Sequence, residues 1–435
     1  MQHTRPGWSA RPAYGAEMRV LLLTPSPPRP QAPSAVPLVA WAQLAALRER
    51  HTVTVVCTAG PDPAEHAAVE QLRTAGIDVH VQARSEPNAA ARGRRWLGHA
   101  ARWARGGRPM YTIWYYEPGL QRQLDRLLAE RKFDAVNVVD SAMGAYVLRT
   151  TARTRLVEVE VRVPRPVDWR GWMRGNWYRG VLDELDWHRW PEYQRAIWRR
   201  FEQIEVFSAR DAVALAEIAP EATPRVRVNP FGIDIPPAAD PTREEEGTVV
   251  FVGSYTHAPN VDAARWLALE IMPRLRDQWP GVRLRLVGED PRGALHGLAN
   301  ADVEVCGWAP AIEPVLERAA VVAAPVRIGG GQRMKVLQAM ALGKAVVTTP
   351  RGAEGVLHGA GDSPVAVGAT AVEIADALAT LLADRTARRA LATRARAAAI
   401  ESHSVAAYGT RLHDALDALC MDRRAGRAGF AGAHR

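Results

Sequence analysis

The chain has 435 residues, of which 47% are hydrophobic, and a formal net charge of +9. This length exceeds what one hydrophobic core usually supports, so we expect a globular protein of two domains. No apolar run approaches the roughly 18 residues that span a bilayer, and the stretch Val20–Leu23 is too short for the core of a signal peptide. We therefore expect a cytoplasmic protein. The three cysteines are far apart, which indicates reduced thiols and no zinc site.

The basic residues are almost all arginines. Only Lys132, Lys335 and Lys344 are lysines among 56 basic residues. Arginines are scattered among acidic residues through most of the chain, which favours a solvated surface with a modest excess of positive charge. An anionic partner, such as a nucleotide, a phospholipid or a nucleic acid, stays open on charge alone.

The first half alternates short apolar segments with helical patterns. Residues 1–17 are rich in Gly, Pro and Arg and are expected to be a disordered lead-in. The predicted strands are Arg19–Thr24, Val53–Cys57, Val79–Val81, Ala135–Val139 and Leu156–Val159. This alternation predicts a Rossmann-like domain with a parallel sheet over residues 18–235.

A second alternation follows the acidic linker Asp240–Gly247. Its predicted strands are Val249–Val252, Leu284–Val287, Val303–Val305, Val321–Ala324 and Ala345–Thr348, with a helix over Val261–Arg276 after the first of them. We expect a second Rossmann-like domain over residues 236–403, a C-terminal helix over 404–420 that packs back on the first domain, and a disordered tail over 421–435. Two such domains place a ligand cleft between the carboxyl ends of their sheets.

The segment Gly329–Gly355 carries the clearest chemical signal. Three glycines, Gly329, Gly330 and Gly331, precede a predicted helix over Met334–Leu342. Glycines let backbone N–H groups approach an anion closely, and the start of a helix adds unpaired amides and the positive end of its dipole. The segment therefore predicts a phosphate cradle. Its pattern is neither that of a P-loop nor that of a dinucleotide fingerprint.

This segment resembles the signature of the retaining, nucleotide-sugar-dependent glycosyltransferases of the GT-B fold (glycosyltransferase family 4-like, group 1). The resemblance continues through Phe251–Asp262, Leu286–Glu289, Val305–Trp308 and Asn229–Asp234, and so covers nearly the whole second half in the right order. The first half resembles the family only in the placement of its strands and in short segments. The resemblance implies an α/β protein of GT-B architecture, with two Rossmann-like domains whose parallel sheets face each other across a central cleft.

Within the resemblance, Arg333 and Lys335 are expected beside the donor diphosphate, where cations stabilise the charge of the leaving group. The alternative for Lys335 is an exposed helix side chain, and the presence of Lys344 nearby shows that a lysine can also occur here by chance. Gln338 stands where the family has a glutamate that binds the ribose hydroxyls. Glutamine keeps one acceptor oxygen and loses the charge; its alternative is a helix residue that faces solvent.

Other cleft residues follow from the same resemblance. Gly253 and Ser254 are expected to let the donor phosphate approach, with Gly329, Gly330 and Gly331 opposite them. Trp308 is expected to contact the nucleobase or, alternatively, to pack against a neighbouring helix. Glu354 is expected near donor or acceptor hydroxyls. Asn260 and Asp262 are read either as cleft residues or as the N-cap and first-turn acid of a helix.

The first half departs from the family in two places. Relatives have a histidine on the acceptor side after the strand at Leu156–Val159, whereas this chain has Glu160 and Arg162 nearby and no histidine. We expect one of these two residues to substitute, or turnover to be slow. In addition, the loop Pro25–Pro37 contains no glycine, which disfavours close approach of a phosphate to its backbone.

Tryptophans and arginines gather in two stretches of the first half. One runs from Trp96 to Tyr116, and the other contains Trp169, Trp172, Trp177, Trp187, Trp190 and Trp198. These residue types suit a membrane interface, so the stretches predict contact with a lipid-linked or aromatic acceptor at the inner membrane face. The alternative is two helices that pack through tryptophan. Without an RNA-binding motif, nucleic acid is not expected.

We therefore expect a cytoplasmic glycosyltransferase, peripheral at the membrane if its acceptor is lipid-linked, that serves polysaccharide biosynthesis. The resemblance implies transfer of a hexose-like sugar from a nucleoside diphosphate donor to a hydroxyl acceptor with retention. The nucleotide sugar is a co-substrate, and neither a cofactor nor a metal is expected. Two alternatives stay open: a GT-B sugar-nucleotide epimerase, and a non-catalytic regulatory protein that binds a nucleotide sugar.

Overall fold

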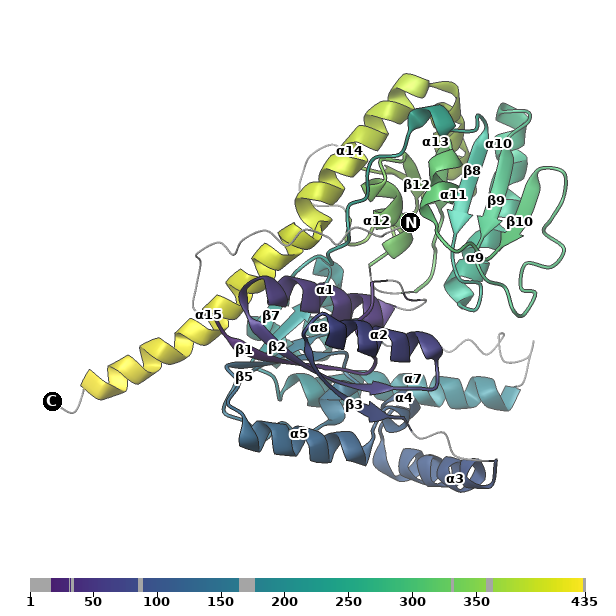
Figure 1. Cartoon of the computed structure of the whole chain (residues 1–435). Coiled ribbons are helices and arrows are strands. Elements are labelled where there is room, and N and C mark those ends of the chain that lie inside the picture. The colour runs from purple at the N-terminus through teal and green to yellow at the C-terminus, as the bar shows by residue number, and fades with distance from the viewer. Residues whose placement is uncertain are drawn as a thin grey trace. The chain divides into compact units, whose positions relative to one another are not determined.

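The computed structural model describes residues 17–30, 32, 35–84, 89–163, 177–329, 332–356 and 363–432. Trp169 and Trp172 lie outside these ranges, as do Gly330 and Gly331. The chain divides into two compact units (Figure 1). The first comprises residues 1–205, 215–227 and 409–435, and the second comprises 206–214 and 228–408. Each unit is an α/β domain built on one sheet.

The first domain has a seven-stranded sheet in the order β3-β2-β1-β4-β5-β6-β7. Strands β3 to β6 of that order pair in parallel, as the alternation of strands and helices predicts. The order reverses beside β1, the pattern of a doubly wound sheet. The strands are β1 Arg19–Thr24, β2 Thr52–Ala59, β3 Asp78–Ala83, β4 Ala135–Val139, β5 Arg153–Val157, β6 Gln203–Val206 and β7 Val226–Val228.

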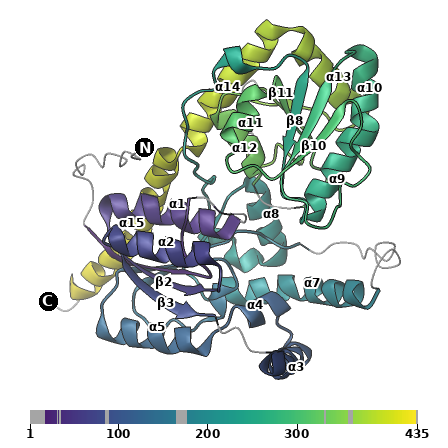
Figure 2. The ribbon, with the colours of Figure 1, turned by 45° about the vertical axis from the view of Figure 1, so that its right-hand side comes forward.

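Helices connect these strands and cover the faces of the sheet (Figure 2). They are α1 Ala35–Arg50, α2 Pro63–Thr74, α3 Ala89–Gly106, α4 Met110–Trp114, α5 Pro118–Glu130, α7 Trp177–Trp198 and α8 Ala209–Ile218, with 3-10 turns at Met143–Ala145 and Pro220–Arg225. Pro63 and Pro118 stand in the first turns of α2 and α5, where a missing N–H costs no hydrogen bond.

A buried polar network fixes α1 on this sheet. Gln43 of α1 donates to Glu205 of β6 at 2.8 Å and accepts from Asn137 of β4 at 2.9 Å. Arg155 of β5 is fully buried, donates to Asn137 at 2.8 Å and forms an ion pair with Glu205. Since each buried charge here has an opposite charge and hydrogen-bond partners, the network holds four elements in one register.

The second domain has a six-stranded, fully parallel sheet in the order β10-β9-β8-β11-β12-β13. Its order reverses between β8 and β11, so a crevice is expected there at the carboxyl ends of the strands. The strands are β8 Thr248–Val252, β9 Arg283–Val287, β10 Val303–Gly307, β11 Val321–Ala324, β12 Val346–Thr348 and β13 Ala366–Val367.

The helices of this domain are α9 Ala258–Trp266, α10 Met272–Gln278, α11 Glu313–Arg318, α12 Met334–Ala341, α13 Ala371–Ala383 and α14 Arg385–His403, with a 3-10 turn at Pro241–Arg243. The sequence predicts one helix over Val261–Arg276. The structure instead has α9 and α10 joined by a π-helical turn over Leu267–Ile271. Such a turn holds one extra residue per turn, a departure that the apolar spacing alone does not reveal.

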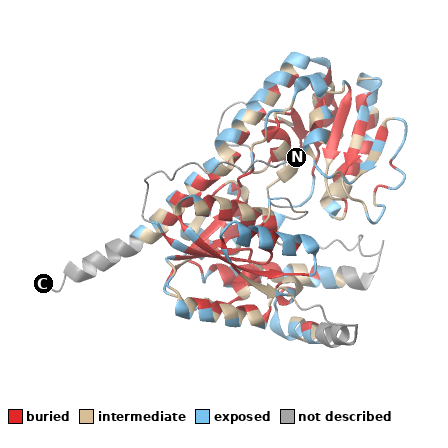
Figure 3. Ribbon diagram, in the orientation of Figure 1, coloured by how far each residue is buried: buried red, intermediate tan, exposed pale blue. Residues whose placement is uncertain are grey.

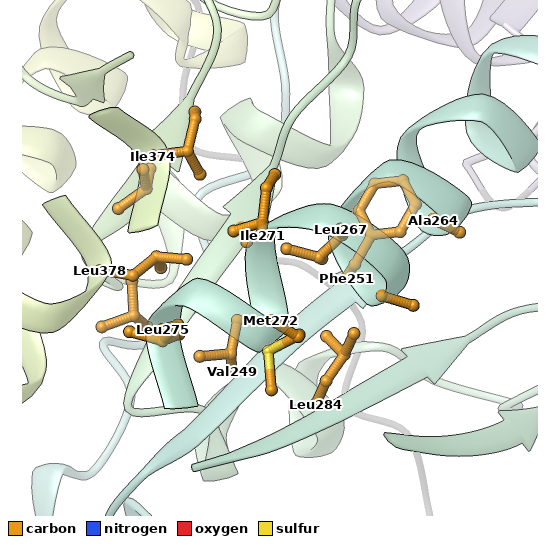
Figure 4. Packing of buried hydrophobic residues seen from close by; sticks show 14 of the residues in the cluster. Val249, Phe251, Ala264, Leu267, Ile271, Met272, Leu275, Leu284, Ile374 and Leu378 are labelled. Carbon is orange, nitrogen blue, oxygen red and sulfur yellow. The ribbon is translucent and has the colours of Figure 1, made fainter. Parts of the chain in front are cut away.

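Apolar side chains from α9, α10, α13 and the strands form the core of the second domain (Figure 4). Phe251, Ile271, Leu275 and Leu378 are among its members. Figure 3 shows the same distribution along the ribbon, with buried residues concentrated on the strands and exposed ones on the outer helix faces. Because this core anchors both α9 and β8, the loop between them has fixed ends.

The last helix, α15, spans Val405–Gly432, and its residues from Gly409 onward belong to the first domain. Tyr408, Leu412 and Leu416 on this helix are fully buried. Among the described residues, no helix combines the length and the apolar character needed to cross a bilayer.

Candidate functional site

The candidate site lies at the carboxyl edge of the second domain's sheet, where the strand order reverses. The loop after β8 contains Gly253 and Ser254, and the loop after β11 leads through Gly329 to α12. Each loop leads to a helix, α9 after the first and α12 after the second. Lys335 of α12 connects these two helices by donating a hydrogen bond to Oδ1 of Asn260 on α9. The site is therefore built at the position where doubly wound sheets bind ligands.

Lys335 is a half-buried cation with neutral partners among the described residues. Its ammonium group contacts Asn260 and lies 4.6 Å from the centroid of the Phe251 ring. Among the residues that the structure describes, it has no carboxylate partner. Burial, and then the neighbouring charge of Arg333, lowers the pKa of Lys335 to about 7. A negatively charged ligand at this point would restore the proton to Lys335 and receive a charge-assisted hydrogen bond.

Two arginines converge on the backbone of the glycine loop. Arg333 donates to the carbonyl oxygen of Gly329 at 2.8 Å, and Arg351 donates to the same oxygen at 3.1 Å. Gly329 has φ of +96°, a left-handed conformation that glycine adopts at little cost. Together with Lys335, these arginines place three cations around one short loop. The sequence analysis assigns no role to Arg351, although this residue lies within the segment Gly329–Gly355.

The absence of a side chain at two glycines permits the close packing of this edge. A Cβ atom on Gly253 would lie 3.0 Å from the side chain of Asn260 and 3.1 Å from Nζ of Lys335. A Cβ on Gly288, where φ is +147°, would lie 1.8 Å from the carbonyl oxygen of Gly253. Ser254 donates to Oε1 of Glu289 at 2.8 Å, which ties the ends of β8 and β9 together.

Gln332 fixes the other end of the glycine loop. Its Oε1 accepts from the N–H of Phe231 at 2.8 Å, and its Nε2 donates to the carbonyl oxygen of Gly355 at 2.9 Å. The same nitrogen lies 3.1 Å from Nδ1 of His403. The segments around Phe231 and Gly355 thus hold the glycine loop in place, because the side chain of Gln332 bonds to the backbone of both.

The remaining predicted site residues lie around this edge. Gln338 is half-buried on α12, one helical turn after Lys335 and on the same face. Trp308 follows β10 and is 70% exposed, so the alternative of packing against a helix is wrong. Glu354 accepts from Arg210 at 2.9 Å. Gly330 and Gly331 lie outside the described residues.

The N-cap interpretation of Asn260 is also wrong. The N-cap of α9 is His257, and Asn260 lies inside the helix. Its amide donates to the carbonyl oxygen of Ser254 at 2.7 Å while its oxygen accepts from Lys335. Asp262 is paired with Arg327 at 2.7 Å. The local pattern near Asn260 fits a cap, but its actual partner, Lys335, is far away in sequence.

In the first domain, two carboxyl groups meet at the carboxyl ends of β4 and β5. Asp140 follows β4 with φ of 75°, the one described non-glycine residue with positive φ. Glu158 follows β5, is buried, and accepts hydrogen bonds from Ser141 and, at 2.7 Å, from Trp198. Burial and then the charge of Asp140 raise the pKa of Glu158 to about 8, so this carboxyl holds a proton at neutral pH.

Glu160 and Arg162, which the sequence offers in place of the missing histidine, form an ion pair at 3.2 Å. Arg162 also lies 3.5 Å from the centroid of the Trp190 ring, a cation–π contact. The sequence interpretation missed Asp140 and Glu158. An acidic residue directly after each of two buried strands is the signal that could have found them.

Most described tryptophans of the two Trp- and Arg-rich stretches pack or form hydrogen bonds within the first domain. Trp198 and Trp190 are buried. Trp103 donates to Asp186 at 2.7 Å, and Trp187 donates to the carbonyl oxygen of Val163 at 2.9 Å. Trp114 is 55% exposed. The alternative that these tryptophans pack inside the protein therefore holds for the four that are buried or hydrogen-bonded within the first domain, Trp103, Trp187, Trp190 and Trp198.

A comparison with known protein families finds a likeness in the second domain. A sequence profile of the family "Glycosyl transferases group 1" matches residues 246–384, which contain the whole candidate site from Gly253 to Glu354. This part of the chain is therefore similar to the group 1 glycosyltransferases. No curated protein sequence matches the chain. The family resemblance and the class of enzyme predicted from the sequence are confirmed.

Solved structures extend the likeness to nearly the whole chain. Anabaena HepE in complex with UDP and glucose is 15% identical, with a TM-score of 0.61, over 92% of this chain and 100% of that one. Sucrose-phosphate synthase from Thermosynechococcus elongatus is 15% identical, with a TM-score of 0.64, over 95% and 100%. A glycosyltransferase from Rickettsia africae is 10% identical, with a TM-score of 0.62, over 93% and 98%. At these identities the likeness concerns the fold, and it confirms the GT-B class.

Proposed function

We propose that the chain transfers a sugar from a nucleoside diphosphate sugar to a hydroxyl acceptor. The observation that carries this proposal is Lys335, a half-buried lysine whose described partners are neutral, at the switch point of the second domain's sheet. A cation that is partly withdrawn from water without a carboxylate partner is costly unless a ligand supplies the opposite charge. Arg333 and Arg351 on the adjacent loop fit the two phosphates of such a donor.

The chemistry follows from where charge develops. As the bond between the anomeric carbon and the diphosphate oxygen breaks, the nucleoside diphosphate leaves with the electron pair. The acceptor oxygen bonds to the anomeric carbon, and its proton passes to the oxygen of the leaving diphosphate. Lys335, Arg333 and Arg351 stabilise the charge that grows on the leaving diphosphate, because they are already in position before the reaction. Retention at the anomeric carbon is part of the proposal and rests on the family resemblance.

A diphosphate donor is further supported by the relatives. Anabaena HepE has crystal structures in complex with UDP-glucose and in complex with UDP. Gln338 lies on the same face of α12 as Lys335 and is the residue that we propose for the ribose. Trp308, exposed at the end of β10, is proposed for the nucleobase, Gly253 and Ser254 for the approach to the phosphates, and Glu354 for a sugar hydroxyl.

The test is a turnover assay with the purified full chain. A panel of nucleotide sugars is incubated with hydroxyl acceptors, and release of nucleoside diphosphate is measured together with the mass of the glycosylated product. We expect release with at least one donor, and about tenfold or more loss of kcat/KM in Arg333→Gln, since a charge-assisted hydrogen bond contributes about 1.5–3 kcal/mol.

Arg274→Gln is the matched control, because Arg274 is exposed on α10 of the same domain and, among the described residues, its guanidinium hydrogen-bonds to the carbonyl oxygen of Glu270 alone. We expect this control to behave as wild type. If no nucleotide sugar binds to the wild-type chain, or if the Arg333 and Arg274 variants behave alike, the proposed donor site is wrong. Conversion of the nucleotide sugar into an epimer without an acceptor would identify the epimerase alternative.

A further inference from the structure

A second cationic region lies in the first domain, on α3 and α4. Residues 87–116 contain six arginines and no aspartate or glutamate, in a chain that otherwise mixes 56 basic with 47 acidic residues. Figure 1 and Figure 2 both show α3 at an edge of the first domain beside α4 and α7. This concentration of one charge distinguishes the region from the solvated arginines elsewhere.

A cavity of about 690 Å³ opens on this region. Its lining includes Arg102 and Arg105 of α3, Arg108 of the following turn, and Thr112, Ile113 and Tyr116. Gly98 and Ala101 line it as well, so one face of α3 carries two small residues that leave room and two arginines that border it. The volume suits a phosphorylated sugar or a lipid headgroup.

The three arginines of this cavity have no carboxylate partner among the residues that the structure describes. Arg200 donates to the carbonyl oxygens of Gly144 at 2.6 Å and Tyr146 at 2.8 Å, and to no carboxylate among the described residues. Burial lowers the pKa of Arg200, and the positive charge of Arg108 contributes to the same shift. Like charges that lie close together are stabilised when an anion binds between them.

The walls of the cavity are held rigidly. Asp186 of α7 accepts from Nε1 of Trp103 at 2.7 Å and from the N–H of Met110 at 2.6 Å, and so ties α3 and α4 to α7. Arg189 of α7 lies 3.9 Å from the centroid of the Trp103 ring. One turn earlier on α3, the ring of His99 meets that of Trp114. Since these contacts fix α3 in place, the helix positions of the exposed Arg102 and Arg105 beside the cavity are set before any ligand arrives.

We infer that this cavity, bordered by Arg102, Arg105 and Arg108, binds a phosphate or diphosphate group. Planar guanidinium groups bind phosphate oxygens in pairs, which favours phosphate over a less charged ligand. The identification of this group with part of the acceptor rests on the proposed glycosyltransferase function, whereas the binding of the anion does not. Two sources share the chemistry: a soluble phosphorylated sugar and a lipid headgroup.

The experiment is chemical protection of individual arginines in the full chain. Phenylglyoxal modifies accessible arginines, and peptide mass spectrometry reads each site separately, so anion binding in the second domain does not interfere. At an inorganic pyrophosphate concentration about ten times its Kd, we expect modification of Arg102 and Arg105 to slow about tenfold, because only about one site in ten is free.

Arg122 and Arg126 serve as internal controls, since they are exposed on α5 of the same domain and lack a carboxylate partner among the described residues. They lie four positions apart on their helix, and Arg102 and Arg105 lie three positions apart on α3. We expect no protection of these two arginines. Equal protection of all four arginines, or protection of none, would overturn the inference.

A second measurement separates the two sources and tests the site again. Sedimentation with vesicles of phosphatidylcholine alone is compared with sedimentation with equal parts of phosphatidylcholine and phosphatidylglycerol. If a lipid headgroup is the ligand, Arg102→Gln/Arg105→Gln loses binding to the anionic vesicles and Arg122→Gln/Arg126→Gln retains it. Pyrophosphate protection without vesicle binding identifies a soluble phosphate. Vesicle binding that both double variants lose equally would contradict a site at this cavity.

Discussion

A half-buried lysine and a fully buried one lie at opposite ends of α12, and their surroundings differ in kind. Lys335, at the start of the helix, contacts an amide oxygen and an aromatic ring. Lys344, just after the end, is 1% exposed, donates to Glu244 at 2.7 Å and to the carbonyl oxygen of Glu317 at 3.3 Å. Both lysines have a lowered pKa because of burial, but only Lys344 has a carboxylate that raises it again.

The difference separates a structural lysine from a ligand-binding one. Lys344 is neutralised inside the protein, so its charge contributes to folding. Lys335 leaves its charge available at the carboxyl edge of the sheet, where Arg333 and Arg351 also lie. Sequence alone presents two lysines nine positions apart in one motif. Only the identity of their partners shows that one belongs to the site and the other to the scaffold.

The largest effect is expected on stability, from Lys344→Met. This change leaves the half-buried carboxylate of Glu244 with a longer contact to Arg388, at 3.5 Å, as its remaining ion pair among the described residues. Removing one partner of a buried ion pair costs about 3 kcal/mol or more. We expect the free energy of unfolding, measured by urea denaturation, to fall by that amount. Donor affinity, measured on the folded fraction, should not change; a folded Lys344 variant that has lost donor binding would erase the distinction between the two lysines.

The next effect is expected on donor affinity, from Lys335→Met. Loss of a charge-assisted hydrogen bond of about 1.5–3 kcal/mol should weaken nucleotide-sugar binding about 10- to 100-fold. Stability should stay the same or rise, because the variant no longer buries an ammonium group among neutral partners. Calorimetric titration and thermal unfolding measure the two quantities.

Lys132→Met is the matched control for the Lys335 variant, since Lys132 is exposed in the first domain. This control should bind the donor as wild type does. A Lys335 variant that is destabilised but binds the donor normally would show that Lys335 is a second structural lysine.

A smaller effect is expected from Arg351→Gln. Arg351 contacts Gly329 from the segment after β12, and glutamine retains a hydrogen-bond donor while losing the charge. We expect a loss of donor affinity of about tenfold or less, and partial loss of its dependence on salt, because one screened charge is removed. Titrations at low and high ionic strength measure this. An unchanged affinity at both salt concentrations would exclude Arg351 from the site.

The sequence predicts the contiguous part of the site and misses the parts that depend on distant contacts. Gly329, Arg333 and Lys335 lie within one turn and one helix start, so their proximity follows from local geometry. The contact between Lys335 and Asn260 depends on the packing of α9 and α12 on neighbouring strands. The residues next to Asn260 in the sequence give no sign of this contact, and the N-cap interpretation was wrong for that reason.

The same limit applies to the first domain. Its strands were predictable from short apolar runs between helical patterns, since each run reflects burial on a parallel sheet. Asp140 and Glu158 meet because β4 and β5 pair in register, with Val139 opposite Val157. A missing histidine was visible in the sequence, but the protonated carboxyl of Glu158 depends on burial that only the folded chain provides.

The most direct test of the donor site is the pH dependence of nucleotide-sugar affinity in wild type and Lys335→Met. With its pKa at about 7, Lys335 is charged in the free protein below that pH and neutral above it. Both phosphates of a nucleotide sugar are esterified, so the ligand's charge stays constant across this range. We expect wild-type affinity to fall as the pH rises from about 6 to about 8.5, by up to about tenfold per pH unit above the pKa, and the variant to bind weakly at both values. Equal affinities of wild type and variant at both pH values would contradict the account.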